Sequence, residues 1–203
     1  MNQAAKHWER HLPEGKYGAH LFPEFETRAK AVSAEILRVK SPAEARKALL
    51  DLVQSLQAKT AVAVSCALQE KAGAHEALRS AGIQLFTGRA DIAEHAATAD
   101  VGISGVEFAV AETGSVCQKA TAVEDRLVSM LPPVHVAFLD SSRVLPGIED
   151  AFEVFGKVFD RGYISFITGP SRTADIERVL TIGVHGPSRF VVIAVDDAGG
   201  EGR

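Results

Sequence analysis

The chain has 203 residues, of which 46% are hydrophobic and 24% are charged, and its formal net charge is −4. This length and apolar content are enough for one domain with a buried core, with or without an extension. A small acidic excess without a Lys/Arg block argues against a dedicated nucleic-acid binder. The sequence contains no stretch of about 18 apolar residues, so we predict no membrane-spanning helix.

The residues present also argue against secretion and against a bound metal or cofactor. The first ten residues lack the apolar core of a secretory signal, so we expect a cytoplasmic protein. Cys66 and Cys117 are the only cysteines, whereas an iron–sulfur cluster usually needs four thiolates. The histidines show neither HxH nor HExxH spacing, and the chain has no GxGxxG or GxxxxGKS/T motif. We therefore expect no metal and no cofactor.

The N-terminal quarter is expected to be an extension followed by helices. Residues 1–24 are polar, are interrupted by proline and glycine, and form the predicted extension. Residues 25–203 form the predicted α/β domain, with a helical lead-in over 25–58. One helix with an apolar face is predicted over 25–39, and a second begins at Ser41-Pro42, where serine suits the N-cap and proline the first helical position.

From residue 59 onward, short apolar strands alternate with helices. Strands are predicted at 60–64, 83–86, 100–104, 134–139, 163–167 and 189–195, and helices at 71–80, 92–98, 148–159 and 176–180. The segments 108–111 and 115–117 predict a hairpin or a bulged turn around Glu112-Thr113-Gly114. This pattern predicts an α/β fold with a mainly parallel sheet covered by helices, in which ligands bind beyond the carboxyl ends of the strands.

The segment 168–175, TGPSRTAD, gives the clearest indication of a binding site. It lies between an apolar strand and a predicted helix, whose start would offer unpaired N–H groups and a positive dipole end. A small carboxylate or phosphate would be held by Gly169, Ser171, Arg172 and Thr173, with Arg172 as the bidentate partner. A charge-assisted hydrogen bond is worth roughly 1.5–3 kcal/mol, so Arg172→Ala should weaken anion binding about ten- to a hundredfold. The simpler alternative is a plain turn with a hydroxyl helix cap.

Two other glycine-bearing corners are candidates for the same pocket. Glu112, followed by Thr113 and Gly114, is either a nucleophile or general base at a strand end or a solvated turn residue. His185-Gly186 precedes the last strand, where His185 is either a residue that closes the pocket or part of an ordinary loop. His135 lies between valines of a predicted strand, which favours a hydrogen-bonded core histidine over a metal ligand.

Four blocks of the sequence, taken together, resemble the LUD (lactate utilisation) domain family, and within it the C-type proteins. They are ADVGISGVEFAVAETGS (99–115), LPPVHV (131–136), TGPSRTADIE (168–177) and GVHGP (183–187), in the right order over about 90 residues. The sequence departs from the family after Gly114, where Ser115–Ala120 lacks the smoother apolar, glycine-rich strand that the resemblance leads us to expect.

The resemblance implies a fold of the NagB/RpiA/CoA-transferase-like type and a link to oxidation of L-lactate to pyruvate beside an iron–sulfur subunit. It supplies no catalytic residues for this chain. The leading hypothesis is therefore an accessory, non-redox subunit with a small-anion pocket. An enzyme of CoA or acyl transfer that uses Glu112 as nucleophile is the alternative. A third possibility is an interaction module in which Trp8 and Phe22 of the N-terminal segment contact a partner.

Overall fold

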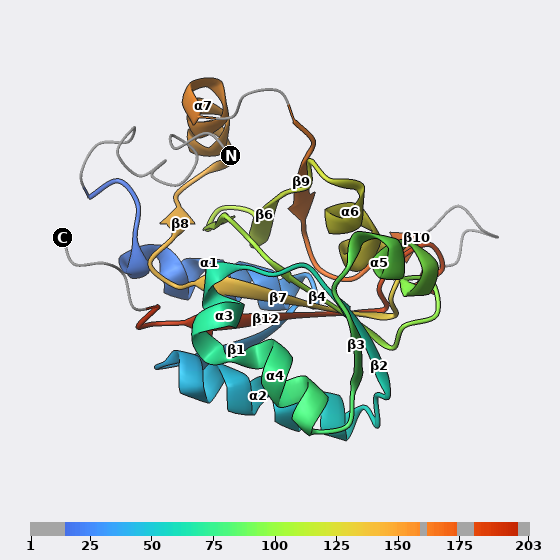
Figure 1. The fold of residues 1–203 in the computed structure, drawn as a ribbon. Coiled ribbons are helices and arrows are strands. Elements are labelled where there is room, and N and C mark those ends of the chain that lie inside the picture. The colour runs from blue at the N-terminus through green and yellow to red at the C-terminus, as the bar shows by residue number, and fades with distance from the viewer. Residues whose placement is uncertain (1–14, 159–161, 174–180, 199–203) are drawn as a thin grey trace.

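A six-stranded, all-parallel sheet forms the centre of the fold (Figure 1), which we describe from a computed structural model. The structure describes residues 15–158, 162–173 and 181–198. The strand order is β1-β12-β7-β4-β2-β3, and every neighbouring pair is parallel. In that order the strands are β1 (Glu35–Val39), β12 (Arg189–Val195), β7 (Val134–Asp140), β4 (Val101–Gly105), β2 (Thr60–Ala63) and β3 (Gln84–Phe86).

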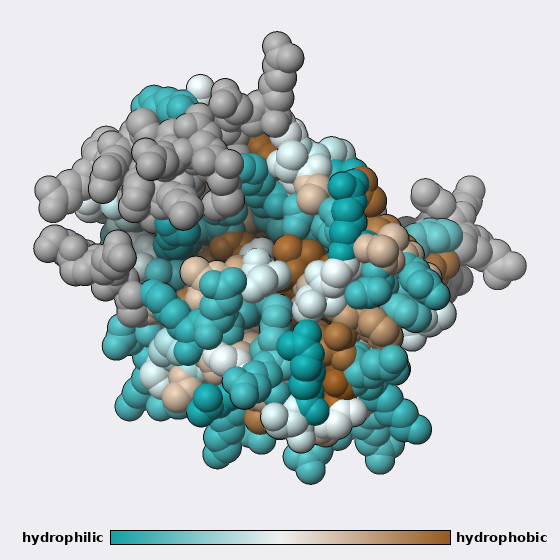
Figure 2. Space-filling view, in the orientation of Figure 1, coloured by the Kyte–Doolittle hydropathy of each residue, from teal (hydrophilic) through white to brown (hydrophobic). Residues whose placement is uncertain are grey.

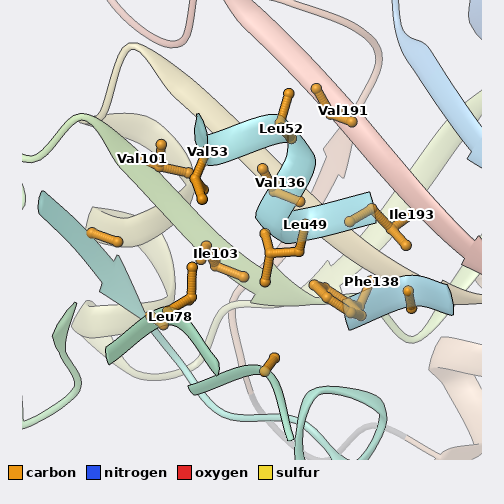
Figure 3. Packing of buried hydrophobic residues seen from close by; sticks show 14 of the residues in the cluster. Leu49, Leu52, Val53, Leu78, Val101, Ile103, Val136, Phe138, Val191 and Ile193 are labelled. Atoms are coloured by element: carbon orange, nitrogen blue, oxygen red, sulfur yellow. The ribbon is translucent and has the colours of Figure 1, made fainter. Parts of the chain in front are cut away.

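Three helices cover one face of this sheet: α2 (Pro42–Ser55), α3 (Ala67–Ala72) and α4 (Ala74–Ser80). The Ser41 hydroxyl accepts a hydrogen bond from the Glu44 N–H at 3.3 Å, so α2 starts where the sequence predicts. Leu49, Leu52 and Val53 of α2 project onto β4, β7 and β12 because residues three and four apart share one face of a helix (Figure 3). This layer holds the largest group of buried side chains.

A second, four-stranded sheet and α1 (Phe22–Ala31) cover part of the opposite face. The second sheet has the order β8-β5-β6-β9, with β8 (Val144–Leu145), β5 (Phe108–Val110), β6 (Ser115–Lys119) and β9 (Ile164–Ile167). Its outer face packs on α7 (Ile148–Val158), while α5 (Arg89–His95) and α6 (Val123–Met130) pack beside β2 and β4. A short 3-10 helix (Ala19–Leu21) precedes α1, and a two-stranded ribbon joins β10 (Arg172–Thr173) to β11 (Thr181–Ile182).

The predicted α/β class with a mainly parallel sheet is confirmed, and so is the hairpin, since β5 and β6 pair antiparallel. β6 forms despite the departure of Ser115–Ala120 from the expected family pattern, and its first four residues are buried. The helix predicted over 71–80 is divided, because Gly73 adopts a left-handed conformation between α3 and α4. The helix predicted over 176–180 lies outside the described residues.

The predicted helix over 25–39 is wrong in its second half. Helix α1 ends at Ala31, and Glu35–Val39 is an edge strand of the main sheet, paired with β12. The chain turns at Ser33, which has a φ of 68°, and pairing with β12 then outweighs the helical pattern of the sequence. The lead-in is therefore part of the sheet and not a purely helical segment.

Phe22 is not an exposed docking residue. It begins α1, is fully buried, and packs edge-on against Phe25 with ring centroids 5.6 Å apart. The guanidinium of Arg38 lies 4.5 Å above its ring. The predicted division at residue 24 thus falls within α1, and Trp8 lies outside the described residues.

Among the described residues, no helix is both long and apolar enough to cross a membrane.

Candidate functional site

Two of the glycine-bearing corners meet at the C-terminal end of α1. A Cβ atom on Gly114 would lie 2.4 Å from the backbone nitrogen of Ala29, and one on Gly169 would lie 2.3 Å from the carbonyl oxygen of Val32. Both glycines have positive φ, 67° and 80°. Glycine is required at both positions for two reasons: the backbone is left-handed there, and another backbone segment approaches too closely for a side chain.

The guanidinium of Arg172 also lies at the end of α1. Its Nη2 donates to the carbonyl oxygen of Val32 at 3.1 Å and to the Ser33 hydroxyl at 2.7 Å. A cation at a helix C-terminus is favourable because the last carbonyl groups carry the negative end of the helix dipole. The contact gives the arginine a structural role that the sequence could not indicate, since the predicted helix ran through Val32 and Ser33.

Hydroxyl groups join the same two corners directly. The Ser115 and Thr168 hydroxyl oxygens are 2.6 Å apart and link the start of β6 to the end of β9. The Thr113 hydroxyl oxygen is buried and has no hydrogen-bond partner among the described residues. A buried hydroxyl without a partner is costly, so this oxygen is an unfavourable feature of the packing around Gly114.

The corner at residues 183–188 packs against the corner at residues 168–175. The Ser171 N–H donates to the Pro187 carbonyl at 2.8 Å, and the Gly183 N–H donates to the Ser171 carbonyl at 2.9 Å. A Cβ on Gly186 would lie 3.0 Å from that of Ser171. Thr173 pairs with Thr181 in the ribbon, and His185 is exposed. The three predicted corners therefore come together in the fold, as the sequence suggested.

The three glycine-bearing corners do not lie beyond the carboxyl ends of the parallel strands, where the sequence predicted the binding site. The loop 183–188 leads into the amino-terminal end of β12, and α1 leads into the amino-terminal end of β1. The corners thus lie at the amino-terminal edge of the parallel sheet and not beyond its carboxyl edge. The reason is that β9, whose end carries Thr168 and Gly169, belongs to the second sheet. Arg172 and Thr173 form a short strand, so no helix begins at the arginine, and the Ser171 N–H is already bonded.

Glu112 turns away from the other corners toward α7. Its Oε2 accepts a hydrogen bond from the Ile148 N–H at 3.0 Å, at the first residue of that helix. A carboxylate at a helix N-terminus satisfies an otherwise unpaired N–H and complements the helix dipole. The geometry gives Glu112 a capping role, while acyl transfer through this carboxylate stays a prediction.

Replacing Glu112 by alanine is expected to lower the free energy of unfolding by about 1 kcal/mol, the usual value of a helix N-cap. Glu112→Gln should lose less, since the amide oxygen can still accept from Ile148. Urea denaturation measures both, with Glu94→Ala on the exposed face of α5 as the control. An acyl-enzyme trapped by hydroxylamine from wild type but not from Glu112→Gln would instead identify a nucleophile.

A buried Ser–His pair lies between the two sheets. The Ser104 hydroxyl oxygen is 2.8 Å from Nε2 of His135, and the imidazole is fully buried and stacks on Phe190 with centroids 5.2 Å apart. Burial lowers the pKa of His135 to about 3, which keeps the ring neutral at physiological pH. The prediction of a hydrogen-bonded core histidine is confirmed.

The cysteines provide no reactive thiolate. Cys117 is buried in β6 and Cys66 is half-buried at the start of α3, and burial raises the pKa of both thiols. No group of three or more His, Cys, Asp or Glu side chains within the described ranges is arranged to hold a metal ion.

Two shallow hollows lie along α6, and the second is close to the corner at residues 183–188, because a Cβ on Gly186 would lie 3.7 Å from the Met130 carbonyl oxygen. One, of about 470 Å³, is lined by residues of α5 and α6, including Arg89, Val123 and Glu124. The other, of about 480 Å³, lies between α6 and Tyr163, with Arg126 and Met130 in its lining. Neither hollow was predicted from the sequence, because no helix was assigned to residues 123–130.

Comparisons with known proteins identify the family. A lactate utilization protein C from Geobacillus sp. (strain WCH70) is 36% identical over 115 residues, covering 54% of this chain and 47% of the relative. The protein of the same name from Bacillus velezensis is 37% identical over 109 residues, covering 51% and 45%. The chain therefore spans about half the length of the curated relatives it matches.

A solved structure is similar over almost the whole chain. The DUF162 family protein from Deinococcus radiodurans superimposes with a TM-score of 0.59 at 20% identity, covering 91% of this chain and all of that one, which supports the fold alone. The family model of the LUD domain matches residues 22–195, from the start of α1 to the end of β12. The chain belongs to the LUD domain family.

Proposed function

We propose that this chain acts in lactate utilisation, as an accessory component of a cytoplasmic system that oxidises L-lactate to pyruvate. The observation that supports the proposal is its membership of the LUD domain family over residues 22–195, with C-type lactate utilization proteins among its relatives. The α/β domain would bind or position substrate, and electron transfer would occur on another subunit.

An iron–sulfur subunit is the proposed partner. Oxidation of lactate to pyruvate releases two electrons, which require an acceptor. Four thiolates usually hold an iron–sulfur cluster, whereas this sequence supplies two cysteines, one of them buried inside β6. The proposed division of labour places the redox centre on the partner and substrate handling on this chain.

A small carboxylate is the proposed ligand at the glycine corners. Arg172 donates to Val32 at the end of α1, and the hydroxyls of Ser115, Thr168 and Thr113 belong to the two segments whose glycines approach residues 28–32. A guanidinium carries five N–H donors in a planar fork, and the contacts with Val32 and Ser33 both use Nη2. Arg172 can therefore cap α1 and present further donors to an anion at the same time.

Calorimetric titration with L-lactate, pyruvate and inorganic phosphate tests this pocket. Arg172→Ala should weaken binding of the preferred anion about ten- to a hundredfold, as expected for loss of a charge-assisted hydrogen bond. Ser33→Ala removes the other partner of the cap but keeps the guanidinium, so it separates a structural effect from a binding effect. Arg89→Ala, on the exposed surface of α5, is the matched control. Wild-type affinity in Arg172→Ala would refute the pocket.

Growth on L-lactate tests the physiological role independently. Deleting the gene in a strain without any other LUD-domain gene should abolish growth on L-lactate but leave growth on pyruvate unchanged. Normal growth of that strain on L-lactate would contradict the proposed role. Restored growth with wild type but not with Arg172→Ala would connect the role to the pocket, provided that the variant is folded and present at wild-type level.

A further inference from the structure

β9 is the outermost described strand of the second sheet, and one of its edges faces away from β6. The Ala120 N–H donates to the Tyr163 carbonyl at 2.8 Å, so the odd-numbered residues of this segment direct their backbone groups toward β6. By the alternation of an antiparallel ladder, the N–H and C=O groups of Ile164 and Phe166 point to the opposite edge. Within the described part of the chain, no backbone hydrogen bond reaches those groups.

This edge is short but lacks charge, proline and a bulge, three features that commonly prevent strand pairing. Proteins protect exposed edges with lysine, proline or a bulge, because an unpaired edge is a template for another strand. Residues 162–169, GYISFITG, contain no charged residue and no proline. The pairing of β9 with β6 is regular along its whole length, so no bulge bends the strand away. The edge of β9 is therefore competent to add a strand.

Apolar side chains are exposed on both sides of this strand. Five of the seven large hydrophobic side chains exposed in the described residues lie on α6 or α7 or next to α6 or β9 in the chain: Val123, Met130, Leu131, Phe152 and Tyr163. Figure 2 shows small apolar patches among polar surface in the region over which Figure 1 draws β9. Clustered exposed apolar surface of this kind is typical of an interaction site.

The two faces of β9 differ in what they present. Ile164 and Phe166 face α7, and the Phe152 ring, 62% exposed, lies 6.3 Å from that of Phe166. Tyr163, 56% exposed, faces α6, where the Arg126 guanidinium lies 5.0 Å from its ring. An added strand would cover exposed aromatic surface on both faces.

We propose that the edge of β9 pairs antiparallel with β9 of a second copy of this chain, forming a two-fold dimer with one continuous sheet. A two-fold axis normal to the sheet at Ser165 places Ser165 opposite itself and Phe166 opposite Ile164 of the second copy. Those two residues carry the outward-facing backbone groups, so each N–H meets a C=O. The same register places Tyr163 opposite Ile167 of the second copy. The two members of each pair lie on the same face of the sheet.

A second copy fits this edge better than an unrelated strand for two reasons. Any isologous contact must be self-complementary. This register matches Ile164 with Phe166 on one face and Tyr163 with Ile167 on the other, where the small Ser165 lies opposite itself at the axis. The strand also brings no charge to the axis, although each copy has a net charge of −4. The dimer would cover Phe152 and Tyr163, which the single chain leaves exposed.

Sedimentation equilibrium of the full chain, with two substitutions at the axis, tests the proposal. The wild type should be a dimer at micromolar concentration. Ser165→Lys places like charges opposite each other and should raise the dissociation constant at least tenfold, roughly the effect of 1.4 kcal/mol. Gln84→Lys adds the same charge at the exposed edge strand β3 and should leave the dimer unchanged.

Disulfide formation gives an independent readout that does not depend on loss of stability. Residues opposite each other in a non-hydrogen-bonded pair have Cα atoms about 4.5 Å apart, within the range that a disulfide spans. Ser165→Cys should therefore form a covalent dimer under mild oxidation, while wild type and Gln84→Cys should not.

Two results would overturn the proposal. A wild type that stays monomeric up to high micromolar concentration would do so, and it would leave the edge to a strand of another protein. A wild-type dimer that survives Ser165→Lys and gives no Ser165→Cys crosslink would place the dimer interface elsewhere. If Ser165→Lys fails to fold, as judged by circular dichroism, the crosslink decides.

Discussion

Replacing Gly114 by alanine is expected to lower the free energy of unfolding by about 3 kcal/mol or more. The added Cβ would lie 2.4–2.5 Å from backbone atoms of Arg28 and Ala29, and the residue has a φ of 67°. A non-glycine residue in this conformation costs about 1–3 kcal/mol, and forcing an extra carbon into a packed contact typically costs another 1–3 kcal/mol. Helix backbone cannot move aside as a flexible side chain can.

The matched control for this substitution is Gly156→Ala in α7. Nothing lies within 4 Å of a Cβ on Gly156, and it has no positive φ. Alanine is favoured over glycine inside a helix by up to about 1 kcal/mol, so this variant should be as stable as wild type or more so. Urea denaturation of both variants measures the difference. Equal stability of the two variants would show that Gly114 is not held against α1.

Stability is expected to fall as the pH is lowered from about 6.5 toward 3, because His135 cannot take up a proton in the folded state. Burial lowers its pKa from 6.5 to about 3, whereas the unfolded chain binds the proton in this pH range. The unfolded state then holds more protons than the folded state, so lower pH favours unfolding. Each such proton lowers the free energy of unfolding by at most about 1.4 kcal/mol per pH unit.

His135→Gln should remove this dependence, although it also lowers stability at neutral pH by losing the stack on Phe190 and altering the bond to Ser104. The measurement is the slope of unfolding free energy between pH 6.5 and 5.5, above the range in which most carboxylates take up protons. Burial also lowers the pKa of His75, but that ring is only half-buried, so His75→Gln serves as the control and should flatten the slope less. A slope unchanged in His135→Gln would contradict the assignment.

The glycine corners show how far the sequence could lead. Gly114 and Gly169 were both expected in turns, both have positive φ, and their segments do come together. We interpreted both glycines from the sequence as parts of a ligand pocket, whereas in the structure both approach the backbone at the end of α1. A glycine that admits a backbone group of a distant helix looks in sequence like one that admits a phosphate, because either requires only the absence of a side chain.

Arg172 and Glu112 show why side-chain roles were harder to predict. Both were expected to face one pocket, but Arg172 contacts the end of α1 and Glu112 caps α7. These partners lie 140 and 36 residues away in the sequence, respectively. No local pattern encodes such contacts, so the direction of each side chain depended on which sheet its segment joined.

The sequence by itself determined the α/β class, most strands of the main sheet, the β5–β6 hairpin, the start of α2 and the buried state of His135. These features depend on local apolar periodicity, turn residues and helix caps, which each segment carries within itself. Only the tertiary structure decided that Glu35–Val39 is a strand, that β9 belongs to a separate sheet, and that the glycine corners meet at the amino-terminal edge. The physical reason is that strand pairing and helix packing join residues far apart in the chain, and their free energies exceed the local preferences of the segments involved.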